Sequence, residues 1–300
     1  MKIVVIGNCQ VNVITALLNS YGVDICQCLL VHLMNSEQIK AVFPQLASFD
    51  IIITQPLGDK YNELATSHMK EIYSDKIVLI HNLYFDGLHP DYYSVQKIGI
   101  PYAETDFGGL SRIMLYSWFY GKTKDDCRQM FSLRWFSKLD YFFAWEKSFN
   151  ELKRRESYVD VSFCQEVEEY TRERPSFFIF NHPTNYILLE YTKKICRYIG
   201  LKRLFLPSDC YADLLLRWEI WSVDPIIAEY HQLPYLSERH FNFGGGRFLS
   251  LEQMIDHEYA LFEKNKDVLS NNLSDQKVGA ILNCWKAQSD SPPAYSELKK

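Results

Sequence analysis

The chain has 300 residues, of which 47% are hydrophobic, and its formal net charge at pH 7 is −5. This composition supports a sizeable core and excludes a disordered chain, and the negative charge gives no argument for nucleic acid or an anionic membrane as the main partner. No apolar run reaches the length of a membrane span, and the N-terminus enters a strand pattern without the layout of a secretion signal. We therefore expect a cytoplasmic protein without a transmembrane segment.

The N-terminal part alternates between short apolar strands and amphipathic helices. Strands are predicted at residues 2–6, 24–31, 50–54 and 76–80, and helices at residues 10–20, 36–46 and 62–73. This alternation predicts an α/β fold in which helices flank a parallel sheet. Because ligands bind at the carboxyl ends of such strands, the residues that follow each strand are candidates for a site. They are Asn8-Cys9-Gln10, His32, Gln55-Pro56-Leu57 and His81-Asn82.

The rest of the chain is mainly helical. From Gly108 to about Tyr170 the pattern predicts two to four helices that form a cap or insertion. A strand at 175–180 and a helix to about 197 indicate that the α/β core resumes, and a short strand or loop is expected at 204–207. Further helices are expected at 211–218, 250–264 and 274–287. We thus expect a first core part at 1–107, an insertion at 108–173, core completion with C-terminal helices at 174–288, and a disordered tail at 289–300.

The eight cysteines include no CxxC pair. Without a secretion signal or that spacing, neither a disulfide framework nor a structural metal site is expected.

One cysteine, Cys9, follows the first predicted strand within Gly7-Asn8-Cys9-Gln10 and precedes a helical pattern. A helix N-terminus stabilises a thiolate and offers backbone N–H groups to an anion, so this turn is suited to acyl transfer. A small buried cysteine that packs at the turn explains the position equally well. The turn has neither the Rossmann fingerprint nor the P-loop spacing, which excludes a standard nucleotide-binding loop.

Two histidines are candidates for a general base. Asp86 and His89 are three residues apart in a loop rich in glycine and proline, where the carboxylate would hold the imidazole in one tautomer. This Asp-x-x-His block resembles that of the SGNH hydrolases, although it occurs early in the chain, and a capped surface turn is the alternative. His182 follows Asn181 at the end of the 175–180 strand; it would act as base or contact a ligand, unless the segment is only a helix start.

Together, GNCQ, TQPL, LYFDGLHPD and FNHPTNY resemble, in order and over roughly the whole chain, the WcbI family of polysaccharide-biosynthesis acetyltransferases. The resemblance implies a CoA-binding protein with an SGNH-like three-layer core. It also implies transfer of an acetyl group from acetyl-CoA to a sugar hydroxyl of a capsular or surface polysaccharide precursor. Cys9, Asp86, His89 and His182 would be the catalytic residues, with either histidine as base and Cys9 as nucleophile or as a binding residue beside the CoA thiol.

The cofactor contacts implied by this assignment are Gly7, Asn8, Gln10, Gln55, Asn181, Arg112 and Arg247. Other cations considered for the phosphates are Lys122 and the run Lys153-Arg154-Arg155, of which the run is more typical of a solvated helix face. The acceptor would be a carbohydrate, a nucleotide sugar or a polysaccharide precursor. An esterase or thioesterase that uses water at the same site, and a non-catalytic module that binds a nucleotide or sugar, are the alternatives.

Overall fold

The structure is a computed structural model that describes residues 1–20, 25–102, 105, 108–201, 205–217, 219–235, 238–242 and 248–286. The described residues form two compact units. Unit 1 is drawn from Met1–Tyr84, Phe149–Arg172 and Asn181–Arg217, and unit 2 from Phe85–Ser148, Glu173–Phe180 and Trp218–Lys300. The expected tail at 289–300 and the candidate Arg247 lie outside the described residues.

A parallel four-stranded sheet forms the centre of unit 1. Its strands are β1 (Lys2–Gly7), β2 (Ile25–Leu30), β3 (Ile51–Thr54) and β4 (Ile77–Leu79), in the order β2-β1-β3-β4. In the register of the sheet, Val4 lies between Gln27 and Ile52. Strand β1 is central and buried on both faces, which explains its continuous apolar run. The strand predictions for this region are confirmed to within about one residue at each described end.

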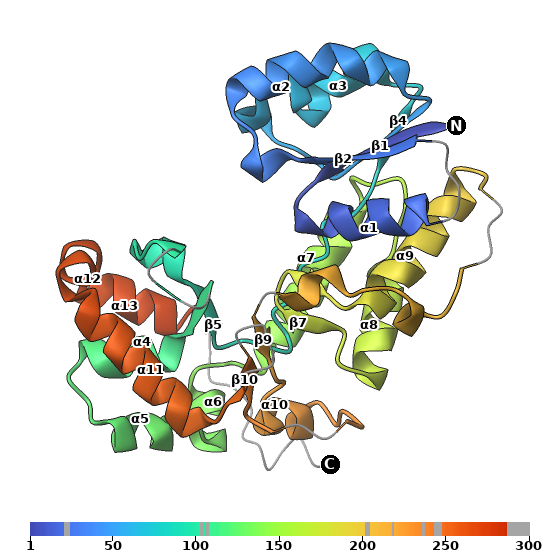
Figure 1. Ribbon diagram of the computed structural model, residues 1–300. Coiled ribbons are helices and arrows are strands. Elements are labelled where there is room, and N and C mark those ends of the chain that lie inside the picture. Colours follow the sequence, from blue (N-terminus) through green and yellow to red (C-terminus); the bar gives the residue numbers. More distant parts are fainter. Residues whose placement is uncertain are drawn as a thin grey trace. The chain divides into compact units, whose positions relative to one another are not determined.

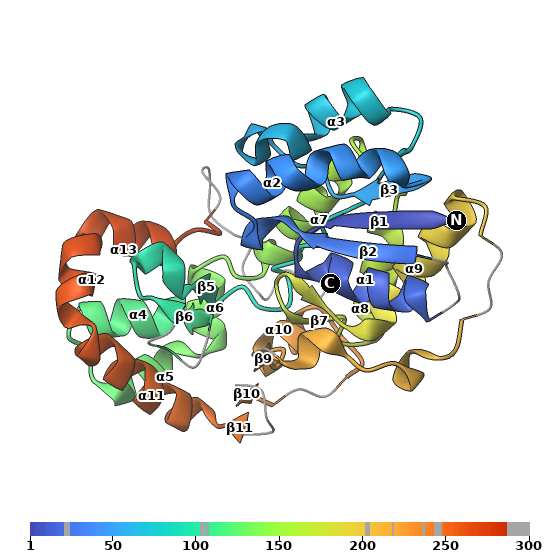
Figure 2. The same ribbon diagram turned by 45° about the horizontal axis from the view of Figure 1, so that its top comes forward.

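Helices cover both faces of this sheet (Figures 1 and 2). Helices α2 (Ser36–Val42) and α3 (Thr66–Tyr73) lie on one face, and α1 (Cys9–Asn19) and α9 (Asn185–Tyr198) lie on the other. On the first face, Val4 packs in one buried cluster with Ile39 and Met69. The predicted α/β fold with a helix-flanked parallel sheet is therefore confirmed. Two helices are shorter than expected because the 3-10 segments η2 (Phe43–Ser48) and η3 (Asp59–Leu64) replace part of them.

The β4 edge of the sheet is closed by a short segment between two helices. Ile80 forms an isolated parallel bridge with Val161. The Leu79 N–H donates to Asp160 Oδ2 at 2.7 Å, and the Leu79 carbonyl accepts from the Asp160 N–H at 2.8 Å. The flanking helices are α7 (Phe143–Glu156), which contributes residues to both units, and α8 (Cys164–Glu173).

The strand at 175–180 does not join this sheet, contrary to the expectation that the core resumes there. It forms β7 (Phe177–Ile179), which belongs to unit 2. The position beside β4 that such a strand would take is held by residues 160–161. Ahead of α9 lie the two residues of β8 (His182–Pro183), and the helix expected at 211–218 is replaced, in its described part, by the 3-10 segment η7 (Leu214–Arg217).

Unit 2 is mainly helical and has small antiparallel sheets. Helix α4 (Arg112–Phe119) packs against α11 (Leu251–Lys264) and α13 (Asp275–Leu282), as Figures 1 and 2 show. Its other helices are α5 (Lys124–Met130), α6 (Leu133–Lys138), α10 (Pro225–Tyr230) and α12 (Lys266–Asn272). Its remaining strands are β5 (Tyr92–Ser94), β6 (Gly109–Ser111), β9 (Ile220–Trp221), β10 (Phe241–Asn242) and β11 (Phe248–Leu249).

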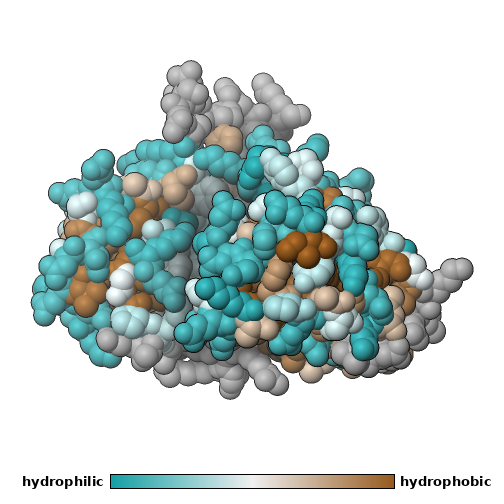
Figure 3. Space-filling model, turned by 90° about the horizontal axis from the view of Figure 1, so that it is seen from above, coloured by the Kyte–Doolittle hydropathy of each residue, from teal (hydrophilic) through white to brown (hydrophobic). Residues whose placement is uncertain are grey.

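Residues 108–173 thus contain five helices, α4 to α8, rather than the two to four expected. The extra breaks occur at turns such as Gly121 and Asp140, both of which have positive φ. Within the described part of the chain, no helix has the length and apolar character needed to cross a membrane. The face shown in Figure 3 is mostly hydrophilic, with hydrophobic residues in separate small groups.

Candidate active site

The turn between β1 and α1 places Cys9 at the carboxyl end of the central strand. Asn8 caps the helix, because its Oδ1 accepts from the Gln10 N–H at 3.0 Å, and Cys9 is the first residue of α1. Gly7 is required by close packing: a Cβ there would lie 2.4 Å from Gln55 Oε1 and 2.7 Å from Val11 Cγ1. The predicted strand-to-helix turn around Cys9 is therefore present in unit 1.

Side-chain amides join the ends of three strands at this turn. The Asn8 N–H donates to Gln55 Oε1 at 2.9 Å, and Gln55 Nε2 donates to Asn8 Oδ1 at 3.2 Å. Asn8 Nδ2 donates to Asn82 Oδ1 at 2.9 Å. Asn8 and Gln55 were predicted to contact a cofactor, but in the structure their amides bond to one another. They hold the carboxyl ends of β1, β3 and β4 together.

Gln10 fixes two loops to the start of α1. Its Nε2 donates to the Leu83 carbonyl at 2.6 Å and to the Asn181 carbonyl at 2.9 Å, and its Oε1 accepts from the Leu83 N–H at 3.0 Å. Both donor hydrogens are used, so Gln10 positions the loops. Asn181 differs, because its buried Oδ1 has no hydrogen-bond partner in the described part of the chain. That oxygen is an acceptor available to a ligand.

The pKa of Cys9 moves as expected for a buried cysteine that packs at the turn, and opposite to the shift expected for a stabilised thiolate. Backbone N–H groups of Cys9 and Gln10 bond to the sulfur and lower its pKa, as a helix N-terminus should. Burial of the thiol is the larger effect and raises the pKa to about 11. The resting side chain is therefore a neutral thiol at pH 7.

Two buried histidines lie in unit 1, and burial lowers the pKa of each to about 4. His182 follows Asn181 directly and lies in β8. His81 follows β4, and its Nε2 lies 3.6 Å from Glu156 Oε1, which favours the charged form but does not outweigh burial. Both imidazoles are neutral at pH 7, and burial makes each a weaker base than an exposed imidazole.

Arg155 lies at the end of α7 and also reaches this region. Its Nη1 donates to the Asn82 carbonyl at 2.9 Å, and its guanidinium lies 5.9 Å from the centre of the Tyr84 ring. The sequence pattern favoured a solvated face for the run 153–155, and this is right for Arg154, whose exposed guanidinium pairs with Glu151 at 2.7 Å. Sequence reasoning named Arg155 within that run but did not separate it from its neighbours, because the direction in which each helix residue faces depends on the packing of the helix.

Asp86 and His89 belong to unit 2, whereas Cys9 and His182 belong to unit 1. The His89 N–H donates to the Asp86 carbonyl at 3.0 Å, so the spacing forms a backbone turn. His89 Nε2 is hydrogen-bonded to the Trp221 carbonyl at 2.8 Å, and its buried Nδ1 has no hydrogen-bond partner among the described residues. The expected bond from the Asp86 carboxylate to this ring is therefore not formed, and burial lowers the pKa of His89 to about 4.

Arg112, also in unit 2, serves the protein's own backbone. It is buried, and it donates from Nε to the Pro90 carbonyl at 3.1 Å and from Nη1 to the Ile281 carbonyl at 3.0 Å. Through these bonds the guanidinium joins α4 to the loop that contains Pro90 and to α13. They argue against the expected role of Arg112 at a cofactor phosphate.

A family model described as polysaccharide biosynthesis enzyme WcbI matches residues 2–204. The chain belongs to the WcbI family. All four motifs on which the resemblance rested lie inside the matched range, which confirms that assignment.

A solved structure of WcbI also matches this chain, with a TM-score of 0.73 and 18% identity, covering 94% of this chain and 97% of that one. That protein is described as a novel polysaccharide biosynthesis enzyme, in its native form without a disulfide bond between CoA and a cysteine. At this identity the likeness shows a shared fold. A comparison with curated proteins found no match.

Proposed function

We propose that this WcbI-family chain binds coenzyme A at the carboxyl end of the unit 1 sheet and transfers an acyl group to a carbohydrate hydroxyl. The acyl group in this proposal is acetyl, and the acceptor is a surface or capsular polysaccharide precursor. The family's role in polysaccharide biosynthesis and the mention of CoA for the solved relative support this proposal. The observation that carries it is the thiol of Cys9 at the end of the central strand. The next residue, Gln10, bonds to the carbonyl of Asn181, whose buried Oδ1 has no hydrogen-bond partner in the described chain.

The residues at this end of the sheet fit coenzyme A. The pantetheine arm carries amide N–H groups, and Asn181 Oδ1 is a buried acceptor without a hydrogen-bond partner in the described chain. The phosphates need a cation, and Arg155 lies at this end of the sheet, where its Nη1 bonds to the Asn82 carbonyl and its Nε lies 3.4 Å from Glu151 Oε1. The N-terminus of α1 is the positive end of the helix dipole, which suits a partial negative charge. Asn181, Arg155 and Cys9 would therefore hold the cofactor.

His182 is the base in the reaction that we propose. When bound, acyl-CoA supplies a thioester carbonyl as the electrophile. His182, neutral at pH 7, removes the proton of the acceptor hydroxyl while the new oxygen–carbon bond forms. As the carbon–sulfur bond breaks, His182 returns that proton to the sulfur, so the step is balanced. The start of α1 stabilises the negative charge that develops on the carbonyl oxygen.

Cys9 acts in this proposal as a binding residue beside the sulfur of the cofactor. A pKa of about 11 leaves almost no thiolate at pH 7, which argues against Cys9 as the nucleophile of the reaction. A thiol beside the CoA sulfur would allow a mixed disulfide with CoA under oxidising conditions; the solved relative is described in a form without such a bond. Since no acyl group resides on Cys9, replacement by serine should weaken CoA binding more than it lowers turnover.

The test is CoA binding by thermal shift and calorimetry, followed by acetyl transfer. Saturation at about 100 times the dissociation constant should stabilise the folded chain by about 2.7 kcal/mol. His182→Gln should abolish transfer but leave CoA bound, whereas the exposed His68→Gln on α3 should behave as wild type. A folded protein whose melting temperature does not change in millimolar CoA refutes the proposal. Acetyl-CoA turnover with no need for a sugar would instead assign a hydrolase.

A further inference from the structure

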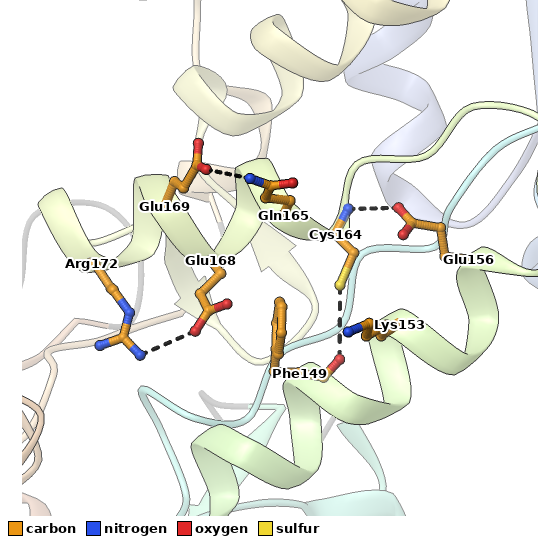
Figure 4. A pocket seen from close by; sticks show the side chains of 8 residues that line it. All are labelled: Phe149, Lys153, Glu156, Cys164, Gln165, Glu168, Glu169 and Arg172. Carbon is orange, nitrogen blue, oxygen red and sulfur yellow. Dashed lines mark hydrogen bonds and ion pairs between the residues drawn. The ribbon is translucent and has the colours of Figure 1, made fainter.

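A polar cavity of about 530 Å³ lies between α7 and α8 in unit 1 (Figure 4). It is separate from the turn that holds Cys9, and nothing in the proposed reaction uses it so far. Its lining residues are Phe149, Lys153, Glu156, Cys164, Gln165, Glu168, Glu169 and Arg172. The volume lies within the range of about 300–1,000 Å³ that is typical of small-molecule sites.

The walls offer hydrogen-bond donors and acceptors around one aromatic side chain. Gln165 donates to Glu169 at 2.9 Å and Arg172 donates to Glu168 at 3.1 Å, so pairs along α8 hold these groups in place (Figure 4). Phe149, on α7, supplies an apolar surface among them. Hydroxyl groups both donate and accept hydrogen bonds, and the C–H faces of a sugar ring pack on aromatic rings. This lining therefore suits a carbohydrate.

The charges favour a neutral sugar over an anionic one. Three carboxylates, from Glu156, Glu168 and Glu169, face the cavity together with two cations, Lys153 and Arg172. An added negative charge would meet an excess of acidic groups. A neutral sugar would meet paired charges that bind hydroxyls without such repulsion.

The last turn of α7 connects this cavity to the proposed reaction site. Glu156 lines the cavity, its Oε1 accepts from the Cys164 N–H at 2.9 Å, and the same oxygen lies 3.6 Å from His81 Nε2 at the end of β4. The preceding residue, Arg155, donates to the Asn82 carbonyl. Glu156 thus borders the cavity and lies beside the end of β4, and Arg155 next to it reaches the strand ends.

We infer that the α7–α8 cavity is a binding subsite for the acceptor, which is a neutral carbohydrate of one or two rings. This inference rests on the proposed function, since it assigns the acceptor of that reaction. It adds Lys153, Gln165 and Glu169 as groups that contact the sugar hydroxyls.

Saturation-transfer NMR tests the cavity with the methyl glycosides of glucose, galactose, mannose and N-acetylglucosamine, and with sodium glucuronate as the anionic probe. At least one neutral glycoside should bind and glucuronate should bind more weakly. Lys153→Met and Glu169→Gln should each weaken that binding by about five-fold, the loss expected for one hydrogen bond. Arg154→Met is the matched control, because it removes the same charge from the exposed face of α7 that pairs with Glu151.

The CoA thermal shift is measured on the same samples and separates the two proposals. Three results would each overturn the cavity assignment: normal CoA binding with no glycoside bound, equal glycoside binding in all variants, or a preference for glucuronate. Glycoside binding that is weakened by the two cavity variants supports the assignment. If such binding occurred without any CoA shift, the cavity would remain a sugar site while the acyltransferase proposal would fail.

Discussion

Alkylation of Cys9 should become faster with pH up to about pH 11. Burial raises the pKa of this thiol to about 11, against about 8.5 for an unperturbed cysteine. At pH 7.5 its thiolate fraction is then lower by about 300-fold. The more basic thiolate is a better nucleophile by about 10-fold, given a Brønsted coefficient of about 0.45. Cys9 should therefore react about 20-fold to 30-fold more slowly than an unperturbed thiol, before any effect of access.

The assay follows iodoacetamide labelling of the peptide that contains Cys9 by mass spectrometry from pH 7 to pH 11. In the folded chain the rate should rise about ten-fold per pH unit, because each unit multiplies the thiolate by ten. The same peptide in the urea-unfolded chain is the matched reference and should level off near pH 9. Restricted access lowers the rate but does not move the plateau. A folded-state plateau below pH 8 would refute the conclusion that burial outweighs the helix N-terminus.

Two further predictions concern stability. Gln10→Leu leaves the Leu83 N–H, the Leu83 carbonyl and the part-buried Asn181 carbonyl without this partner. The free energy of unfolding in urea should therefore fall by about 2–4 kcal/mol relative to wild type, and a loss below about 1 kcal/mol would contradict the positioning role. Burial lowers the pKa of His81 to about 4, against about 6.5 in the unfolded chain. The stability that this difference contributes is fully present above about pH 6.5 and is lost as the pH falls toward about 4. The loss amounts to up to about 3 kcal/mol. Hydrogen exchange in β4, corrected for intrinsic rates, should show this loss in wild type and a smaller loss in His81→Asn; the same pH profile in both would count against it.

The parallel sheet of unit 1 was predictable because the sequence pattern that specifies each of its strands is local. Each strand is a short apolar run bounded by turn residues, and the amphipathic pattern between strands gives the helices. The sequence of β7 also indicates a strand, but nothing local shows which sheet it joins. That depends on residues 160–161, which occupy the edge of β4. The number of helices after Gly108 was missed because a non-glycine turn such as Asp140, with a φ of 58°, gives little signal in sequence.

The candidate site was only partly predictable, for a similar reason. The GNCQ motif identified the turn, because a strand end followed by a helix start is visible in the sequence. The role of Gln10 in positioning loops was not visible in the sequence, because its bond partners are 73 and 171 residues away along the chain. The sequence left open whether Cys9 is a stabilised thiolate or a buried packing residue, because the size of desolvation depends on the packing of distant segments. Asp86 and His89 have the expected spacing, yet their turn is held by backbone atoms.

The closed edge of β4 has a consequence for self-association. An open sheet edge presents unpaired N–H and carbonyl groups that can recruit a strand from another molecule and start aggregation. Here the Leu79 N–H is bonded to the Asp160 carboxylate and the Leu79 carbonyl to the Asp160 backbone. A strand from a second chain that paired with this edge would have to displace both bonds. The Asp160 carboxylate would then face the backbone of the incoming strand. Asp160 therefore acts as a gatekeeper that keeps the sheet from extending between molecules at this side.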